Sequence, residues 1–303
     1  MPTINEIGFL GTGIMGGPMA VNLAAAGFTV TAYDPDRIRL ASLAERGVAA
    51  AASPAEAAAG RDAVVVMVAS GPVADDVLFG SGGAASAMRP GALLIVMSAI
   101  AVPEAEAQAA KAAKLGLRWL DAPVSGGESG AKAARLSIMV GGAAGDFEVA
   151  RPIFDVLGRA VHIGPVGTGE LAKLVNQLTV ASTIVAVSES LLLAEAGGAD
   201  PARVREALLG GFAQSRIMDE HGKRIIERDF APGGPAKYQI KDTGAAKALA
   251  RSLNLDLPML NLADRLFCDL VENGGGDLDH SALFLELMRR NGRLPQGSVL
   301  AAE

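Results

Sequence analysis

The sequence predicts an α/β fold, in which an N-terminal domain with a doubly wound sheet is joined by a long helix to an all-α C-terminal domain. Short apolar runs alternate with helical segments as far as residue 164, which is typical of a mostly parallel sheet covered by helices. From Glu170 to Ala196 the chain then contains neither proline nor glycine, and no strand-like run follows. We therefore expect two domains, residues 1–164 and residues 165–303, the second beginning with the long helix.

The first predicted unit is a strand, a glycine-rich loop and a helix. A strand over Ile4–Leu10 runs into Gly11-Thr12-Gly13-Ile14-Met15-Gly16, and a helix over Met19–Ala26 and a strand over Thr29–Tyr33 follow. A G-x-G-x-x-G pattern in this position is typical of a dinucleotide site. The sequence thus predicts a Rossmann-type domain; the alternative is a glycine-rich turn without a ligand.

The glycines and the acid that follows them each have a physical reason. The first glycine permits a tight turn, the second lets the backbone approach a pyrophosphate, and the third lets the helix pack on the strand. Asp34 ends the second strand, where a carboxylate accepts hydrogen bonds from the adenosine ribose and repels a 2′-phosphate. We therefore expect NAD, with NADP less favoured, although Arg37 and Arg39 would soften the repulsion.

The remaining elements follow in the same alternation up to residue 164. Ser53 is the expected N-cap of a short helix. The expected helices are Ala55–Ala59, Val73–Leu78, Glu104–Leu115 and Phe147–Leu157. The expected strands are Ala63–Val68, Leu93–Met97, Arg118–Leu120, Leu136–Val140 and Ala160–Ile163. Beyond the long helix, the expected helices are Pro201–Leu209, Ser215–Glu227, Tyr238–Ser252, Met259–Asn273 and Ser281–Arg290.

The composition excludes several classes of function. The formal net charge is −6 and aromatic residues make up 4%, so a nucleic-acid partner is not expected. The single cysteine, Cys268, excludes an internal disulfide, and the three histidines lie far apart, so no metal site is expected. No apolar run is expected to span a membrane, and the N-terminus has no targeting pattern, so we expect a cytoplasmic protein.

The start of the long helix carries the second candidate site. Thr168 is its expected N-cap, and the helix is apolar nearly all round, so we expect it to be buried. Lys173, Asn176 and Gln177 stand at i, i+3 and i+4 and share one helix face. A lysine beside two amides in that position indicates a site, and the alternative is a lysine that snorkels at a domain edge.

Four sequence blocks resemble the β-hydroxyacid dehydrogenase family. They are Gly8 to Gly16, Asp121-Ala122-Pro123-Val124-Ser125-Gly126-Gly127, Gly164 to Gln177, and Lys241-Asp242. The family includes 3-hydroxyisobutyrate dehydrogenase and tartronate semialdehyde reductase and, more distantly, 6-phosphogluconate dehydrogenase. The resemblance implies an NAD-dependent oxidoreductase that acts on a small 3-hydroxy acid or the matching semialdehyde.

The resemblance also implies roles for individual residues. Lys173 matches the catalytic lysine, with Gln177 where many members have asparagine and Asn176 beside it. The substrate-binding residues it implies are Ser125, Gly126, Gly127 and Asp242, and the cofactor contacts it adds are Ser98 and Lys241. The chain departs from the family at Ala99, where a threonine is common, and at Ala134, where a glycine is common.

Lys173 suits a general acid/base. Alcohol oxidation releases a hydroxyl proton that a nearby group must accept, and the reverse reaction returns it. A free lysine has a pKa of about 10.4, so burial, a cationic nicotinamide and the helix dipole would have to lower it. We expect plain structural roles for Asp121 and Pro123 in shaping the turn, and for His280 as a helix cap.

Two other functions remain open. Imine reductases resemble this family but usually lack the lysine, and a non-catalytic dinucleotide-binding module would have lost the lysine or the turn at Ser125. An oxidative decarboxylase of a sugar-acid phosphate is a further possibility by kinship, although no basic cluster for a phosphate is matched. As partners we expect a small carboxylate substrate and a homodimer or homotetramer formed through the α-domain.

Overall fold

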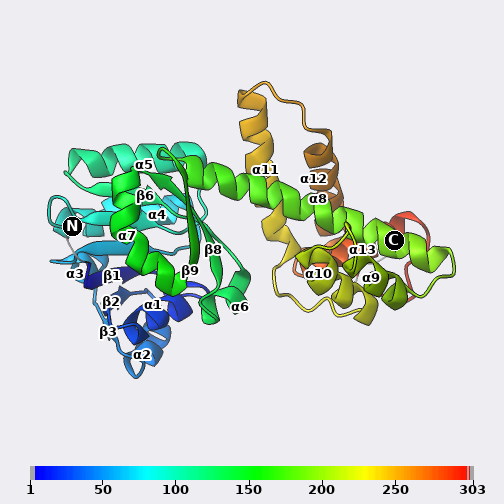
Figure 1. Ribbon diagram of the computed structural model, residues 1–303, viewed down its shortest axis with the longest axis horizontal. Helices are drawn as coiled ribbons and strands as arrows, with labels where there is room; N and C mark the ends of the chain where they lie inside the picture. Colours follow the sequence, from blue (N-terminus) through cyan, green and yellow to red (C-terminus); the bar gives the residue numbers. More distant parts are fainter. Residues whose placement is uncertain (1–3, 299, 301–303) are drawn as a thin grey trace. The chain divides into compact units, whose positions relative to one another are not determined.

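The computed structural model describes residues 4–298 and residue 300. The chain divides into two compact units, Met1–Lys173 and Leu174–Glu303, called unit 1 and unit 2 below. Unit 1 is an α/β domain built on one sheet, and unit 2 is helical (Figure 1). The predicted fold class is therefore confirmed.

The sheet of unit 1 has the strand order β3-β2-β1-β4-β5-β6-β8-β7, with β9 also paired to β8. The strands are β1 (Glu6–Leu10), β2 (Thr29–Tyr33), β3 (Val48–Ala50), β4 (Ala63–Val66), β5 (Leu93–Val96), β6 (Arg118–Asp121), β7 (Val124–Ser125), β8 (Leu136–Gly142) and β9 (Gly158–Gly164). Pairing is parallel from β3 to β6, while β8 runs antiparallel to β6 and β7 and parallel to β9.

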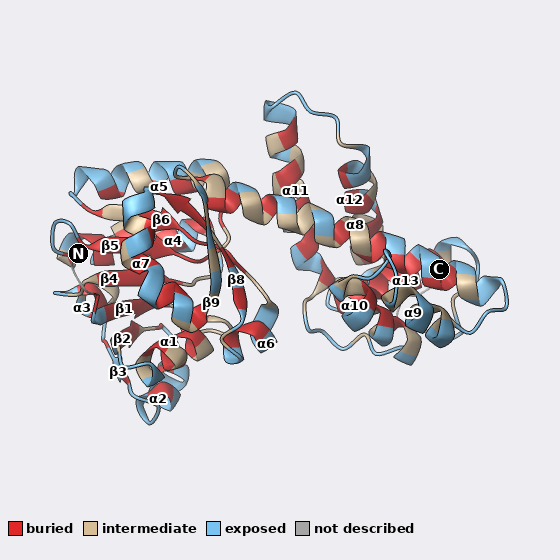
Figure 2. Cartoon of the chain, viewed as in Figure 1, coloured by how far each residue is buried: buried red, intermediate tan, exposed pale blue. Residues whose placement is uncertain are grey.

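The central strands are apolar on both faces because helices cover both sides of the sheet. Every residue of β4 and β5 is buried, which is the pattern of a parallel sheet in a doubly wound domain (Figure 2). Phe9 and Ile95 belong to the core on one face, and Leu10 and Val96 belong to the core on the other. This alternation within a strand follows from the period of two.

All five helices predicted before the long helix are present, and two further helices, α2 and α6, were missed. Those described are α1 (Gly16–Ala25), α2 (Arg37–Ala44), α3 (Pro54–Ala58), α4 (Gly71–Phe79), the 3-10 turn η1 (Ala84–Ala87), α5 (Val102–Lys114), α6 (Gly127–Lys132) and α7 (Ala144–Leu157). Ser53 caps α3 by accepting from the Glu56 N–H at 3.1 Å, as predicted. The helices α2 and α6 and the strands β3 and β7 were not predicted, because each is short and lacks a clear apolar period.

Unit 2 contains helices and, within the described residues, no strand longer than an isolated bridge between Pro235 and Asp279. Its helices are α9 (Pro201–Leu209), α10 (Arg216–Glu227), α11 (Ala236–Ser252), α12 (Pro258–Leu270), the π turn η2 (Val271–Gly275), the 3-10 turn η3 (His280–Ala282) and α13 (Leu283–Arg290). The prediction of an all-α C-terminal region is confirmed, and the bounds of α9 match the predicted range.

The long helix α8 (Thr168–Ala196) follows β9 directly (Figure 1). Thr168 is its first residue and not its N-cap, because its hydroxyl donates to the Pro165 carbonyl at 2.7 Å. The helix is also less buried than predicted, since Val175 is 56% and Leu193 75% exposed. By length and composition α8 is apolar enough to cross a membrane, contrary to the expectation that no run would be. This is weak support for a membrane span, because core helices meet the same criterion.

Candidate dinucleotide and substrate site

The loop between β1 and α1 has the geometry that the glycine pattern predicts. Gly11 has φ +92°, and a Cβ there would lie 2.3 Å from the Met67 carbonyl oxygen, so only glycine fits. A Cβ on Gly16 would lie 2.0 Å from the Gly11 carbonyl oxygen, which shows how closely α1 packs on the end of β1. The first and third glycines are therefore required by the fold itself.

The second glycine differs, because its missing side chain leaves room for a ligand. A Cβ on Gly13 would meet only Nη1 of Arg39, at 3.8 Å. No side chain caps the start of α1, which begins Gly16-Gly17-Pro18, and the Gly17 N–H donates to the Gly13 carbonyl at 2.9 Å. Open space above a glycine at the start of a ten-residue helix fits a pyrophosphate, so these residues suit a bound dinucleotide.

Asp34 links the end of β2 to the glycine-rich loop. One carboxylate oxygen of Asp34 accepts from the N–H and the hydroxyl of Thr12, at 2.7 and 3.1 Å, and the other accepts from the Asp36 N–H at 2.9 Å. The Arg39 guanidinium lies 3.9 Å away, whereas Arg37 donates to the carbonyls of Ala51 and Ala52. Since a carboxylate offers about four acceptor positions, little capacity remains for the two hydroxyls of a ribose.

Ser98 is fully buried after β5, and its hydroxyl already has protein partners. It accepts from the Val68 N–H at 2.7 Å and lies 3.5 Å from the Val66 carbonyl oxygen. Those bonds hold the loop after β4 in place. A direct contact between Ser98 and the cofactor, as the resemblance implied, would have to share this hydroxyl.

The predicted substrate turn, Ser125-Gly126-Gly127, lies between β7 and α6. Gly126 has φ +139° and Gly127 has φ +61°, so both adopt backbone conformations that side chains disfavour. A Cβ on Gly126 would come within 3.2 Å of Leu136, whereas none of the surrounding atoms would block a Cβ on Gly127. The structure therefore explains why this turn needs two adjacent glycines.

Asp121 does more than shape that turn, which is a correction to the sequence prediction. Its buried carboxylate accepts from the N–H groups of Gly167 and Glu170, at 2.8 and 3.1 Å, so it caps the start of α8. No sequence signal indicated this role, because the partners are separated from Asp121 by 46 and 49 positions.

Beyond Lys173, the side chains on the same face of α8 form hydrogen bonds with each other and with a carboxylate of α11. Lys173 is half-buried in the second turn of the helix. Within unit 2, Asn176 donates to the side-chain oxygen of Gln177 at 2.9 Å, and the Gln177 amide donates to Asp242 of α11. Gln177 and Asp242, predicted from separate blocks, are thus brought together, while Lys241 is exposed on α11.

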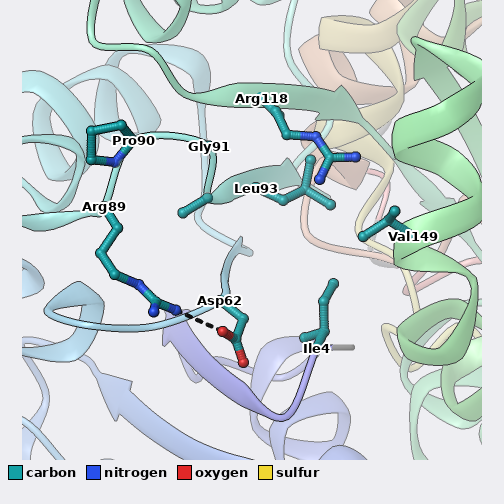
Figure 3. Close-up of a pocket in the computed structure, with 9 residues that line it drawn as sticks. Ile4, Asp62, Arg89, Pro90, Gly91, Leu93, Arg118 and Val149 are labelled. Carbon is teal, nitrogen blue, oxygen red and sulfur yellow. Dashed lines mark hydrogen bonds and ion pairs between the residues drawn. The ribbon is translucent and has the colours of Figure 1, made fainter. Parts of the chain in front are cut away.

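Two other features lie apart from this chemistry. A hollow of about 270 Å³ is lined by Ile4, Leu93 and Arg118 among others, with Arg89 donating to Asp62 at 2.7 Å (Figure 3). These residues stand at the amino ends of the parallel strands, and ligands of doubly wound sheets bind at the carboxyl ends. Among the described residues no group of three or more His, Cys, Asp or Glu side chains could hold a metal ion.

Unit 2 contains a pair of neighbouring histidines, His221 and His280. The rings of His221 and His280 have centroids 6.4 Å apart, and burial lowers the pKa of both, against the opposing charge of Asp279. The capping role predicted for His280 belongs to Asp279, whose carboxylate accepts from the Ser281 N–H and hydroxyl at 3.0 and 2.7 Å. The sequence prediction for His280 was therefore wrong by one position.

Comparison with known proteins identifies relatives over both units. Residues 6–167 match the NAD binding domain of 6-phosphogluconate dehydrogenase, and residues 167–287 match the NAD-binding region of NADP-dependent 3-hydroxyisobutyrate dehydrogenase. The chain is 45% identical over 288 residues to 2-hydroxy-3-oxopropionate reductase of Escherichia coli (strain K12), covering 93% of this chain and 98% of that protein. It is 34% identical to 2-(hydroxymethyl)glutarate dehydrogenase of Eubacterium barkeri, over 92% of this chain and 93% of that protein.

A solved structure of a related enzyme also aligns with nearly the whole chain. The 3-hydroxyisobutyrate dehydrogenase of Mycobacterium tuberculosis, determined with L-serine, is 32% identical and aligns with a TM-score of 0.86. The alignment covers 94% of this chain and 99% of that chain.

Proposed function

The chain belongs to the β-hydroxyacid dehydrogenase family, and we propose that it interconverts a small 3-hydroxy carboxylic acid and its semialdehyde or oxo acid, with Lys173 as the general acid/base. Membership makes it a hydroxyacid dehydrogenase with an NAD(P)-binding domain. The observation that carries the proposal is the position of Lys173 in the second turn of α8. The start of α8 is capped by Asp121, which ends β6, and the chain runs from there into the Ser125 turn.

The proposed proton transfer is assigned to Lys173. When bound, the nicotinamide ring accepts or returns the hydride, so the protein has to move one proton at the reacting oxygen. The Lys173 amine takes the hydroxyl proton during oxidation and returns it during reduction. Gln177, whose amide is held by Asp242, and Asn176, which donates to Gln177, keep this helix face ordered and do not themselves transfer protons.

We assign the substrate carboxylate to Ser125-Gly126-Gly127. The turn follows a strand end, and its glycines leave the backbone N–H groups uncovered by side chains. The names of the relatives support an acid, because 2-hydroxy-3-oxopropionate and 2-(hydroxymethyl)glutarate both carry carboxylates. Methyl esters of good substrates should therefore react poorly, and esters converted as fast as the acids at similar KM would exclude a carboxylate site here.

We assign NAD as the preferred cofactor because Asp34 is a buried acid at the end of β2. A 2′-phosphate would meet this carboxylate, and Arg39 is already shared between Asp34 and Asp36, at 3.9 and 3.5 Å. The measurement is the ratio of kcat/KM for NAD and NADP. Equal efficiency, or preference for NADP, would contradict the assignment.

The test of the catalytic role is Lys173→Ala, assayed with 2-hydroxy-3-oxopropionate and a panel of 3-hydroxy acids by NADH absorbance. We expect kcat to fall by about 100-fold or more, the usual scale for a lost acid/base group. The affinity for NAD should stay within about twofold, because the glycine-rich loop binds it. Lys223→Ala, which removes an exposed lysine of α10, is the control. Near-normal turnover of Lys173→Ala would make the lysine structural.

We also propose that two copies of the chain pair through the α-domain. Val175 and Leu193 on α8 and the fully exposed Phe212 are large apolar side chains that a second copy would cover. Light scattering after size exclusion measures the mass directly, and a monomer at micromolar concentration would contradict this proposal.

Two other functions predict different results in the same assays. An imine reductase would reduce cyclic imines faster than any semialdehyde in the panel. A non-catalytic module would bind NAD but turn over none of the compounds.

A further inference from the structure

A buried carboxylate joins the two parts of unit 1 that carry the proposed chemistry. Asp121 ends β6 and is 0% exposed. Its Oδ1 accepts from the Gly167 N–H at 2.8 Å and its Oδ2 accepts from the Glu170 N–H at 3.1 Å. The first N–H groups of a helix have no partner within the helix, and this carboxylate satisfies two of the groups at the start of α8. A charged acceptor also gives stronger bonds here than a neutral one would.

Glycines bring the helix backbone close enough for these bonds. A Cβ on Gly169, in the first turn of α8, would lie 2.5 Å from the carbonyl oxygens of both Asp121 and Met139. A Cβ on Gly141 of β8 would lie 2.6 Å from Oδ2 of Asp121 and 2.7 Å from the Gly169 nitrogen. The backbone of the first turn of α8 therefore packs closely on the end of β6 and on Met139 and Gly141 of β8, with the Asp121 carboxylate at this contact.

The two ends of this contact lead to the two proposed catalytic elements. Lys173 lies about one helical turn beyond Glu170. In the other direction, Ser125 follows Asp121 by four positions, through Ala122, Pro123 and the start of β7. The Asp121 side chain thus connects the helix that carries the lysine to the strand that leads into the substrate turn.

We infer that Asp121 is a positioning residue, which sets the place of the Lys173 amine by holding the start of α8 on β6. The inference rests on the proposed role of Lys173. It assigns to Asp121 no contact with substrate or cofactor, and its effect on the reaction passes through the lysine.

The first experiment replaces Asp121 with asparagine. Asn keeps the shape and one acceptor, but its NH₂ group would face the second backbone N–H, so one of the two bonds is lost. A displacement of the order of 1 Å at a catalytic group lowers turnover by up to about 100-fold, so we expect kcat to fall by about 10- to 100-fold. The KM for the carboxylate substrate and the Kd for NAD should change by less than about threefold, because neither binding turn is bonded to the carboxylate. A kcat within about twofold of the parent would overturn the inference.

The second experiment separates positioning from general damage by a double-mutant cycle with Lys173→Ala. If Asp121 acts through the lysine, adding Asp121→Asn to Lys173→Ala should lower the residual kcat by less than about twofold. The same 10- to 100-fold loss in both backgrounds would show that Asp121 supports the fold or the substrate turn instead. Failure of the proposed function is visible separately, since Lys173→Ala would then keep normal turnover whatever Asp121 does.

A second variant covers the case in which Asp121→Asn does not fold. Gly169→Ala keeps the carboxylate but introduces a methyl group 2.5 Å from two carbonyl oxygens, which pushes the start of α8 off the strand ends. We expect it to lower kcat selectively as well. Gly164→Ala is the matched control, because its methyl group would meet only Thr168, at 3.4 Å or more. Equal activity of the Gly169 and Gly164 variants would overturn the inference.

Discussion

The C-terminal end of α6 offers a stabilising substitution that can be worked out from the backbone. Ala134 has φ +54°, in the left-handed region. Its N–H donates to the Ala131 carbonyl at 3.4 Å, and the Arg135 N–H donates to the Gly130 carbonyl at 2.9 Å. These two bonds form a Schellman motif with Ala133 as the C-cap, so Ala134 occupies the position where glycine is usual. The glycine expected there by family resemblance is therefore missing at a place where the backbone favours it.

The size of the effect of Ala134→Gly follows from two opposing terms. A non-glycine residue in the left-handed backbone conformation destabilises the folded state by roughly 1–2 kcal/mol, and glycine avoids this cost. Glycine adds freedom to the unfolded chain, which offsets about 0.4–1 kcal/mol of that gain. We expect the free energy of unfolding to rise by about 0.5–1 kcal/mol. For a unit of this size the Tm of its transition should rise by about 1–4 °C.

Differential scanning calorimetry of the full chain measures this change in Tm. Ala133→Gly is the matched control: Ala133 is exposed, has φ −86°, and should lose about 0.4–1 kcal/mol on replacement by glycine. Turnover should be unchanged in both variants. If Ala134→Gly melts at or below the parent temperature while Ala133→Gly behaves as expected, left-handed strain at Ala134 is not a destabilising factor.

Two further predictions concern the cofactor loop and the histidine pair. Gly13→Ala should keep the parent Tm, because its methyl group would meet only Arg39 at 3.8 Å. It should raise the Kd for NAD about tenfold or more, because the methyl group fills the space for the pyrophosphate. Isothermal titration calorimetry measures this Kd, and an unchanged affinity would place the pyrophosphate elsewhere. Burial lowers the pKa of His221 and His280 below 6.5 in the folded chain. The unfolded chain therefore binds more protons than the folded chain as the pH falls through 6.5. The free energy of unfolding should fall over that range and level off below the folded-state pKa values. His221→Asn should make this dependence shallower in urea titrations between about pH 8 and pH 5.5, and an identical slope would show that the pair does not couple to folding.

The sequence by itself determined the class of fold, because the relevant signals are local. The G-x-G-x-x-G pattern and the apolar runs at β1, β4 and β5 are read within a few residues, and the structure confirms the elements they predict. The helix α9 begins with a cap at Asp200 and a proline and was located correctly. A similar signal was available for α2, whose N-cap Asp36 accepts from the N–H groups of Ile38 and Arg39, but it was not used.

The tertiary structure alone decided the relations between distant segments. Strand β8 pairs antiparallel with β6 and β7 and parallel with β9, which the apolar pattern of β8 cannot specify. Gln177 meets Asp242 across 65 positions, and Asp121 caps a helix that begins 47 positions later. The exposure of Val175 likewise depends on what packs against α8 and not on its own period. Periodicity and capping act within one element, whereas a buried hydrogen bond depends on where the fold brings two elements together, so its partners are set only when the chain is packed.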